Sequence, residues 1–130
     1  MARAADAAAN EAAVQAILDA DLVALGPGSL FTCIIPNVLV GGIRDAIRET
    51  HAVRVYVCPK IDSLGETNDM SVADHVVALV AHGLDGALDA VLVHSASKPE
   101  FVYPYQKRAW SLQARRPSRR VRRGLTMTAS

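Results

Sequence analysis

The segment Ala24–Val40, ALGPGSLFTCIIPNVLV, carries the residues best suited to chemistry. A short apolar stretch runs into Gly-Pro-Gly-Ser, and a helical pattern follows. Gly26 and Gly28 lack a Cβ, so the turn can adopt a positive φ and a ligand can approach the main chain closely. Free amides at the start of the next helix, with Ser29 at the N-cap position, would donate to a phosphate or another anion. The alternative is a plain strand-to-helix turn, and the turn alone does not decide between the two.

Three further polar residues near this turn have two interpretations each. Thr32 could donate to a phosphate oxygen or help to cap the helix. Asn37 follows Pro36 in an apolar stretch, and as a buried amide it would need a partner, either in the nearby backbone or in a ligand. Glu66 lies in a loop of about a dozen residues, a length that is often functional. Its carboxylate could hold Mg²⁺, but no second acid is clearly placed beside it, so a solvent-facing position is favoured.

The histidine and cysteine pattern predicts neither a metal site nor a catalytic triad. The four histidines show no metal-ligand spacing with one another or with the two cysteines. His75 lies on a predicted helix, where a lone histidine is more often packed or solvated than reactive. Cys33 and Cys58 lack CxxC spacing and lie in apolar runs, which predicts small buried side chains in a reducing compartment. We therefore expect a cytoplasmic protein.

The elements that must position these residues alternate between helix and strand. Apolar periodicity and capping signals predict helices over Ala4–Ala20, Pro36–Thr50 and Ser71–His82, with Gly83 ending the last, and strands over Asp21–Leu25, Val53–Cys58 and Asp89–Val93. This order predicts an α/β fold, a Rossmann-like parallel sheet with flanking helices and right-handed crossovers. The turn, the loop 59–70 and the segment 94–98 would then meet at the carboxyl edge, where such sheets bind ligands. Three strands are few, which predicts an incomplete domain or an obligate assembly.

Composition sets the remaining limits. The chain has 130 residues, 51% of them hydrophobic, which is enough for one domain with a core, and no apolar run is long enough for a membrane span. From Lys107 onward there are eight basic residues and no acidic ones. Such a block can bind nucleic acid or anionic lipid, but Pro117 and the lack of interleaved aromatics favour a solvated, disordered tail over 108–130. We expect the α/β domain over 1–107 and a short helix opening at Pro99.

Several strings in this order resemble the YvcK-like proteins, also called gluconeogenesis factors, within the wider family of CofD 2-phospho-L-lactate transferases. They are ADLVALGPGSLFTCIIPNVLVGGIRDAI, VRVYVC, GETNDMSVADHV and DAVLV, which together cover roughly Ala12–Val93. The resemblance implies a Rossmann-like fold and binding of nucleotide sugars of the UDP-N-acetylglucosamine kind. It also implies a regulatory role in carbon metabolism and cell shape. By likeness, the nucleotide diphosphate would be bound by Gly26, Gly28, Ser29, Thr32, Asn37, Gly65, Glu66 and Thr67.

Two alternatives stand beside this prediction. The transferase relatives move a phospholactyl group from a guanosine diphospho compound with the help of magnesium, so a CofD-like transferase is the second interpretation. The third is an inactive fragment, because full members of the family are more than twice as long and open with another glycine-rich turn. A missing N-terminal half or a homo-oligomer would then complete the domain. The chain also departs from the family at Pro59 and at Asp62–Leu64, which removes amide side chains from the expected pocket wall.

Overall fold

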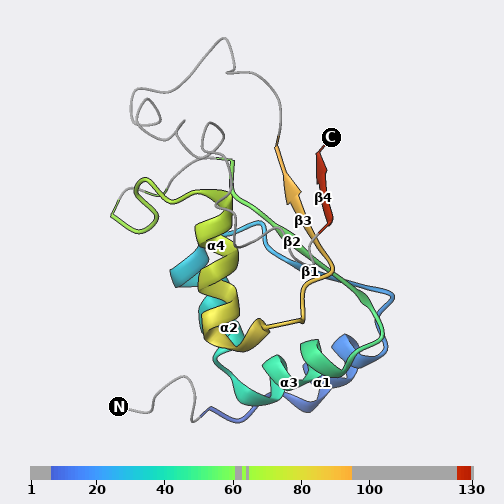
Figure 1. Ribbon diagram of the computed structural model, residues 1–130. Helices are drawn as coiled ribbons and strands as arrows, with labels where there is room; N and C mark the ends of the chain where they lie inside the picture. The colour runs from blue at the N-terminus through green and yellow to red at the C-terminus, as the bar shows by residue number, and fades with distance from the viewer. Residues whose placement is uncertain (1–6, 61–62, 64, 95–125, 130) are drawn as a thin grey trace.

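The computed structural model describes residues 7–60, 63, 65–94 and 126–129 and shows a parallel sheet with helices packed against it (Figure 1). In chain order the elements are α1 (Glu11–Leu18), β1 (Leu22–Leu25), the π-helix η2 (Leu30–Ile34), α2 (Ile35–Val38), α3 (Gly41–Glu49), β2 (Val53–Val57), α4 (Val72–Leu79), the π-helix η3 (Val80–Leu84), β3 (Ala90–Val93) and β4 (Thr126–Ala129). The predicted α/β class and the three predicted strands are confirmed, with strand ends that differ by one residue.

The sheet follows the chain in the simplest order, β1-β2-β3-β4, and every neighbouring pair is parallel. The fourth strand is a finding that the sequence analysis missed. Thr126–Ala129 pairs with β3, in register from Ala90 opposite Thr126 to Val93 opposite Ala129, where a disordered tail was expected. The arginine cluster and the helix expected at Pro99 lie outside the described residues.

Helix α1 is shorter than the predicted Ala4–Ala20. It begins at Glu11 because the side chain of Asn10 accepts hydrogen bonds from the amides of Ala12 and Ala13. Asparagine is among the strongest N-cap residues, and this cap outweighs the helix propensity of the alanines before it. The helix ends before β1 and packs against α3.

The helical segment after the first strand begins earlier than predicted and is broken. It starts at Leu30, directly after Ser29, and a bend of 79° separates Leu30–Val38 from Gly41–Glu49. Ile34, Ile35 and Val38 are buried, as expected for core positions. Within the part of the chain that the structure describes, no single helix is long and apolar enough to cross a membrane, and the bent pair reaches that length only jointly.

Helix α4 begins after Ser71, as the sequence predicted, but it ends at Leu79 and not at His82, and the π-helix η3 continues the helical segment. Ser71 and Asp74 form a capping box: the Ser71 hydroxyl accepts from the Asp74 amide, and the Asp74 carboxylate accepts from the Ser71 amide at 2.8 Å. At the other end η3 closes at Gly83, whose φ of +102° is the left-handed conformation that terminates many helices.

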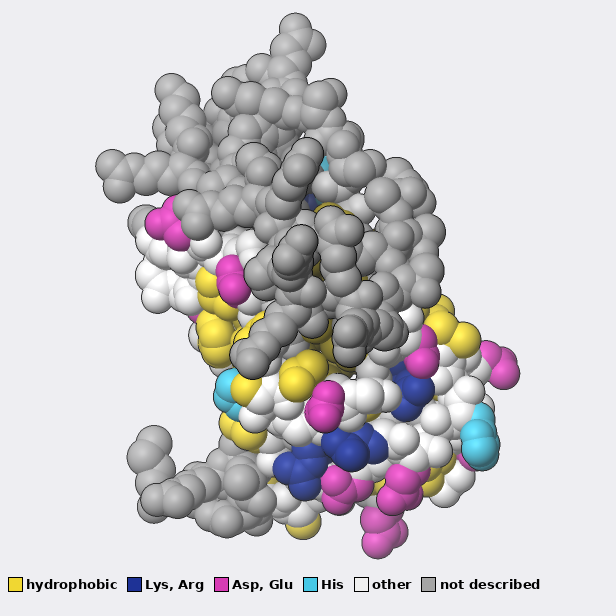
Figure 2. Space-filling model, viewed as in Figure 1, with side chains coloured by type: hydrophobic (Ala, Val, Ile, Leu, Met, Phe, Trp, Pro, Cys, Tyr) yellow, Lys and Arg dark blue, Asp and Glu magenta, His cyan; other side chains and the backbone are white. Residues whose placement is uncertain are grey.

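The core lies between one face of the sheet and the helices. Leu25, Tyr56 and Val91 point from three neighbouring strands toward α2, α3 and α4. The helices contribute Leu30, Ile34, Ile35, Val38, Ile47, Val76 and Leu79 to the same cluster. Figure 1 shows α2 and α4 on this side of the strands, and Figure 2 shows acidic and basic side chains interspersed at the end formed by α1 and α3.

An ion pair joins β2 to the loop before β3. Arg54 donates to Asp89 through Nε at 2.8 Å and Nη2 at 2.9 Å, and the Arg54 amide also donates to Asp89 at 2.8 Å. These bonds, led by the guanidinium, hold the pKa of Asp89 below its usual value. A carboxylate whose pKa is lower in the folded than in the unfolded protein stabilises the fold at any pH above its pKa in the unfolded state. This stabilisation is lost as the pH falls through the pKa that the carboxylate has in the folded state.

We therefore expect Asp89→Asn to lower the free energy of unfolding by about 1 kcal/mol at neutral pH, since partly exposed pairs contribute little. The difference from the unsubstituted chain should shrink toward zero as the pH falls through the lowered, folded-state pKa of Asp89. Urea unfolding at several pH values measures this. Asp45→Asn, which removes a more exposed pair with Arg44, is the control. A loss that persists unchanged in acid would contradict this account.

Candidate functional site

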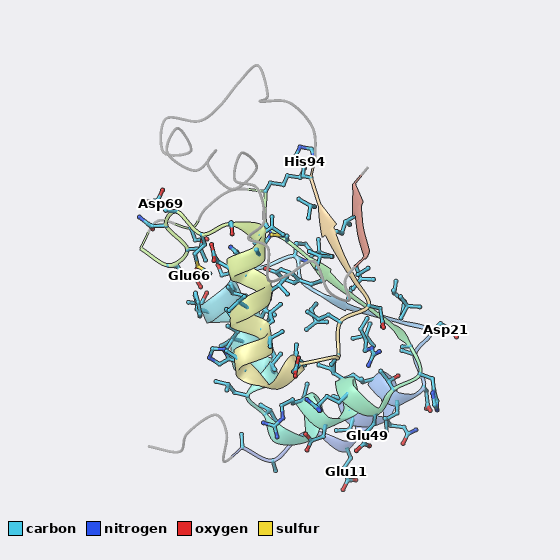
Figure 3. The ribbon with its side chains drawn as sticks, viewed as in Figure 1. Glu11, Asp21, Glu49, Glu66, Asp69 and His94 are labelled. Atoms are coloured by element: carbon cyan, nitrogen blue, oxygen red, sulfur yellow. The ribbon has the colours of Figure 1, made fainter. Side chains whose placement is uncertain are left out.

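The turn after β1 and the loop before α4 meet at the carboxyl edge of the sheet, as predicted. The contact between them is the side chain of Glu66, whose Oε1 accepts hydrogen bonds from the main-chain N–H groups of Phe31 and Thr32, both at 2.9 Å. Figure 3 shows Glu66 beside the start of α4 and His94 beyond the end of β3, whereas Asp21, Glu49 and Glu11 lie at the opposite end. Glu66 is therefore not the solvent-facing residue that the sequence analysis favoured.

The Glu66 carboxylate shows that this helix start can hold an anion. Two first-turn amides point at one oxygen, which is the arrangement that favours negative charge at a helix N-terminus. The amides of Phe31 and Thr32 are therefore occupied from within the chain.

The neighbouring amides of the turn are not used in this way. Among the described residues, the main-chain N–H groups of Gly28, Ser29 and Leu30 have no hydrogen-bond partner. Gly28 and Ser29 are partly exposed, whereas Leu30 is fully buried and its amide is out of reach of a ligand. Ser29 stands at the N-cap position, as predicted, but its side chain makes no capping hydrogen bond, so its hydroxyl is not used by the helix. Its carbonyl accepts from the amides of Cys33 and Ile34 at 3.0 Å, which starts the π-helix. The donors that could meet a ligand are thus at positions 28 and 29.

The two glycines of the turn have different roles. Gly26 has a φ of +97°, and a Cβ there would lie 2.9 Å from the Val57 carbonyl oxygen. At Gly28 φ is not positive, and a Cβ would meet the Cys33 Cβ at 3.4 Å and the Ile34 Cγ1 at 3.9 Å, which are ordinary contacts. The fold therefore requires glycine at 26 but not at 28, so Gly28 can be substituted to probe the approach of a ligand.

Thr32 and Asn37 lie on the outer surface of the helical segment. Both are exposed, which corrects the expectation of a buried Asn37. The Asn37 amide nitrogen donates to the Cys33 carbonyl at 2.7 Å, so the backbone supplies its partner, as one of the two interpretations held. Cys33 is exposed as well, whereas Cys58 is buried. The prediction for Cys33 was wrong because the π-helix turns Leu30 and Ile34 inward and leaves Cys33 outside.

The predicted loop residues Gly65, Glu66 and Thr67 form a compact turn. Thr67 is buried, and its Oγ1 accepts from the Ser63 amide at 2.9 Å, while its own amide donates to the Ser63 carbonyl. Gly65 has a φ of +84° and donates to Asn68. Thr67 and Gly65 therefore shape the loop that presents Glu66, and Thr67 is not at the surface where a ligand would approach.

The comparisons with known proteins agree with this arrangement. The family model described as 2-phospho-L-lactate transferase CofD matches residues 1–125. This chain belongs to the CofD family. A gluconeogenesis factor of Bacillus subtilis is 38% identical over 104 residues, which are 80% of this chain and 32% of the relative. A Streptococcus pyogenes relative is 45% identical over 92 residues, covering 71% of this chain and 28% of its own length.

A solved structure shows the same fold in a CofD relative. A protein from Bacillus halodurans superposes with a TM-score of 0.70 and 36% sequence identity, over 74% of this chain and 31% of that chain. The CofD chain described here thus spans less than a third of the length of the relatives that it matches. The resemblance drawn from the GPGS and GET strings is confirmed at the level of the family.

The described part of this CofD chain does not fit a magnesium site. No group of three His, Cys, Asp or Glu side chains among the described residues could hold a metal ion. The Glu66 carboxylate, the one candidate ligand from sequence, already accepts two main-chain N–H groups. We therefore derive no chemistry through a metal.

His75 is packed in the core of the CofD domain. It is fully buried on α4, and its Nδ1 lies 2.8 Å from the Tyr56 hydroxyl on β2. Burial, reinforced by Cys58, raises the pKa of Tyr56 well above its usual range, so the hydroxyl keeps its proton. This bond ties α4 to the sheet and supports the structural role that the sequence analysis favoured for His75.

We expect Glu66→Gln to destabilise the fold by about 1 kcal/mol. The substitution replaces a charged acceptor at the start of a helix with a neutral one, and such an acceptor contributes about 0.3–2 kcal/mol. Urea unfolding of the two proteins measures the loss. Glu49→Gln, at the last residue of α3, is the matched control, because removing a negative charge from a helix C-terminus should not destabilise. Equal losses in the two variants would argue against a specific role for Glu66.

Proposed function

We propose that this chain binds the diphosphate of a nucleotide sugar and acts as a regulatory protein of the gluconeogenesis-factor type. The observation that carries the proposal is the pair of open amides at Gly28 and Ser29, on a turn at the carboxyl edge of a parallel sheet. In open parallel sheets this edge is where ligands bind, and main-chain N–H groups in a glycine turn suit phosphate oxygens.

The Glu66 contact limits the proposed site. The Glu66 carboxylate already occupies the amides of Phe31 and Thr32, so a diphosphate would bind beside this negative charge and not on these two donors. The contact also fixes the loop against the turn, which leaves the amides of Gly28 and Ser29 as the diphosphate site. The sugar and base would then extend away from the turn, and UDP-N-acetylglucosamine is the ligand class that the family resemblance implies.

Isothermal titration of the full chain with UDP-N-acetylglucosamine tests the proposal. We expect saturable binding that Ser29→Ala weakens by about 10-fold or more, because a hydrogen bond to a charged group contributes about 1.5–3 kcal/mol. Ser29→Thr, which keeps the hydroxyl, should retain most of the affinity. Gly28→Val should also weaken binding, since a side chain there would project over the open amides.

Two results would reject the proposal. One is the absence of heat of binding from a chain whose circular dichroism shows that it is folded. The other is binding that Ser29→Ala and Gly28→Val leave unchanged, which would place the ligand elsewhere.

A second candidate function follows from the description of the matching family model. A CofD-type transferase would release GMP from a guanosine diphospho donor in the presence of magnesium and a deazaflavin alcohol. The described residues supply main-chain donors but no cluster of acids for a metal, so we expect no release of GMP from this chain. Detection of GMP above the rate without protein would favour the transferase.

A further inference from the structure

The Glu66 carboxylate lies close to the two open amides of the turn. Its Oε1 accepts hydrogen bonds from the Phe31 and Thr32 amides at 2.9 Å, so its loop lies against the turn (Figure 3). The Ser29 nitrogen precedes the Phe31 nitrogen by two residues, which span at most about 7 Å when extended. Adding the hydrogen bond places the Ser29 nitrogen within about 10 Å of the carboxylate oxygen. An anion bound to the Ser29 amide would therefore interact with the charge of Glu66.

The described part of the chain supplies few cations that could offset this charge. Glu66 serves as an acceptor for two N–H groups, as an ionised carboxylate does. Three of the four Lys and Arg side chains in the described ranges bond to other parts of the fold, namely Arg44, Arg48 and Arg54. The fourth, Lys60, is exposed in the loop after β2. Glu66 is half-buried, so salt screens its charge less than that of an exposed acid.

Diphosphate compounds differ in the charge that they would bring beside Glu66. In a nucleotide sugar each of the two phosphates has one ionisable oxygen, so each carries a single negative charge. The terminal phosphate of a nucleoside diphosphate can ionise a second time, with a pKa near 6, so it carries about 1.5 to 2 negative charges at neutral pH. At about 10 Å from Glu66, one extra negative charge weakens binding by about 2- to 15-fold for effective dielectric constants from about 80 down to about 20.

We propose that Glu66 makes the site selective for diphosphate diesters over compounds that end in a free phosphate. This inference rests on the proposed diphosphate site and adds the chemical class that the site accepts. The amides of Gly28 and Ser29 and the Ser29 hydroxyl supply the attraction. The Glu66 carboxylate limits the charge of the ligand, because its own two donors are bonded to it and do not serve a phosphate. Glu66 is thus a specificity-determining residue that acts through its charge.

Isothermal titration of the full chain with two matched ligands tests this inference. The ligands are UDP and UDP methylated on its terminal phosphate, which differ by one methyl group and one ionisable oxygen, both in buffer without divalent cations. We expect the unsubstituted chain to bind the methyl ester about 3- to 10-fold more tightly than UDP at low ionic strength. Glu66→Gln keeps a carbonyl acceptor for the two amides but removes the charge, so this preference should fall below about twofold.

Asp69→Asn is the matched control. Asp69 is an exposed acid of the same loop, Figure 3 shows it apart from Glu66, and asparagine tolerates its φ of 59°. This variant should keep a preference above about threefold, because an exposed charge is screened by salt. The ratio of the two affinities separates charge from structure, since a loop that is merely disturbed would weaken both ligands alike. Circular dichroism confirms that each variant is folded.

A measurement on the unsubstituted chain needs no variant. Raising the salt concentration to about 1 M shortens the Debye length to about 3 Å, so the preference for the methyl ester should shrink toward unity. A preference that persists at this salt concentration would overturn the inference, because a contact with the methyl group would then be its cause.

The remaining outcomes separate this inference from the proposed function. If neither ligand nor UDP-N-acetylglucosamine binds to the folded chain, both are rejected together. If UDP binds at least as tightly as its methyl ester, the selectivity is overturned and the diphosphate site stands. The same conclusion follows if Glu66→Gln reduces the preference no more than Asp69→Asn does.

Discussion

Replacing Gly26 with alanine should destabilise the protein by about 3 kcal/mol. Its φ of +97° is a conformation that costs an L-residue about 1–3 kcal/mol. The new Cβ would also lie 2.9 Å from the Val57 carbonyl oxygen and 3.3 Å from the Ile34 Cδ1. The first neighbour is main chain in the sheet, which cannot move aside as a flexible side chain can. The free energy of unfolding in urea measures the loss.

Gly28→Ala is the matched control for this prediction. Its φ is not positive and the nearest atom to a new Cβ is an ordinary contact at 3.4 Å, so its stability should stay within about 0.5 kcal/mol of the unsubstituted chain. Comparing the two variants distinguishes Gly26, which the fold requires, from Gly28, which a ligand could require. Equal losses at the two positions would contradict the geometry of the turn.

Leu79→Ala should have an effect of similar or greater size, about 2–5 kcal/mol. Leu79 is fully buried on α4, in the cluster that joins the helices to the sheet, and truncating it removes apolar contacts and leaves a cavity. Val77→Ala, two residues earlier on the exposed side of the same helix, should cost less than about 0.5 kcal/mol beyond its small change in helix propensity. A loss at Leu79 below about 1 kcal/mol would mean that α4 is not packed as described.

The strands and the helix ends could be predicted because their signals are local. Apolar runs, interrupted only by Arg54, mark Leu22–Leu25, Val53–Val57 and Ala90–Val93, since a strand in a parallel sheet is shielded by its neighbours. Ser71 and Gly83 mark the two ends of a helical segment by chemistry that depends on a few neighbouring residues.

The helical segment after the turn was harder to predict. A π-helix over Leu30–Ile34 has no distinctive sequence pattern, and Pro36 was expected to begin a helix rather than to lie inside a helical segment. The one-residue shift per turn that a π-helix introduces also explains why Cys33 and Asn37 are exposed although they lie among apolar neighbours.

The position of the turn at the carboxyl edge of the sheet could be predicted, but the contact that organises it could not. Gly26, Gly28 and Ser29 lie at the carboxyl edge as expected because the order of elements fixes that edge. The Glu66 contact joins residues 34 and 35 positions apart, and periodicity and capping rules act only over a few residues. The sequence offered one signal for this contact: an acidic residue in the loop, Glu66, and a helix start at Leu30 that has no side-chain cap.

The order β1-β2-β3-β4 also bears on how the chain folds as it leaves the ribosome. Each strand pairs with the one synthesised just before it, from Leu22 opposite Val53 to Val55 opposite Ala90 and Ala90 opposite Thr126. Among the four described strands, none has to insert between two that are already joined. The described strands can therefore be added one after another at the same edge of the sheet during translation. Each addition requires the closure of a loop of moderate length.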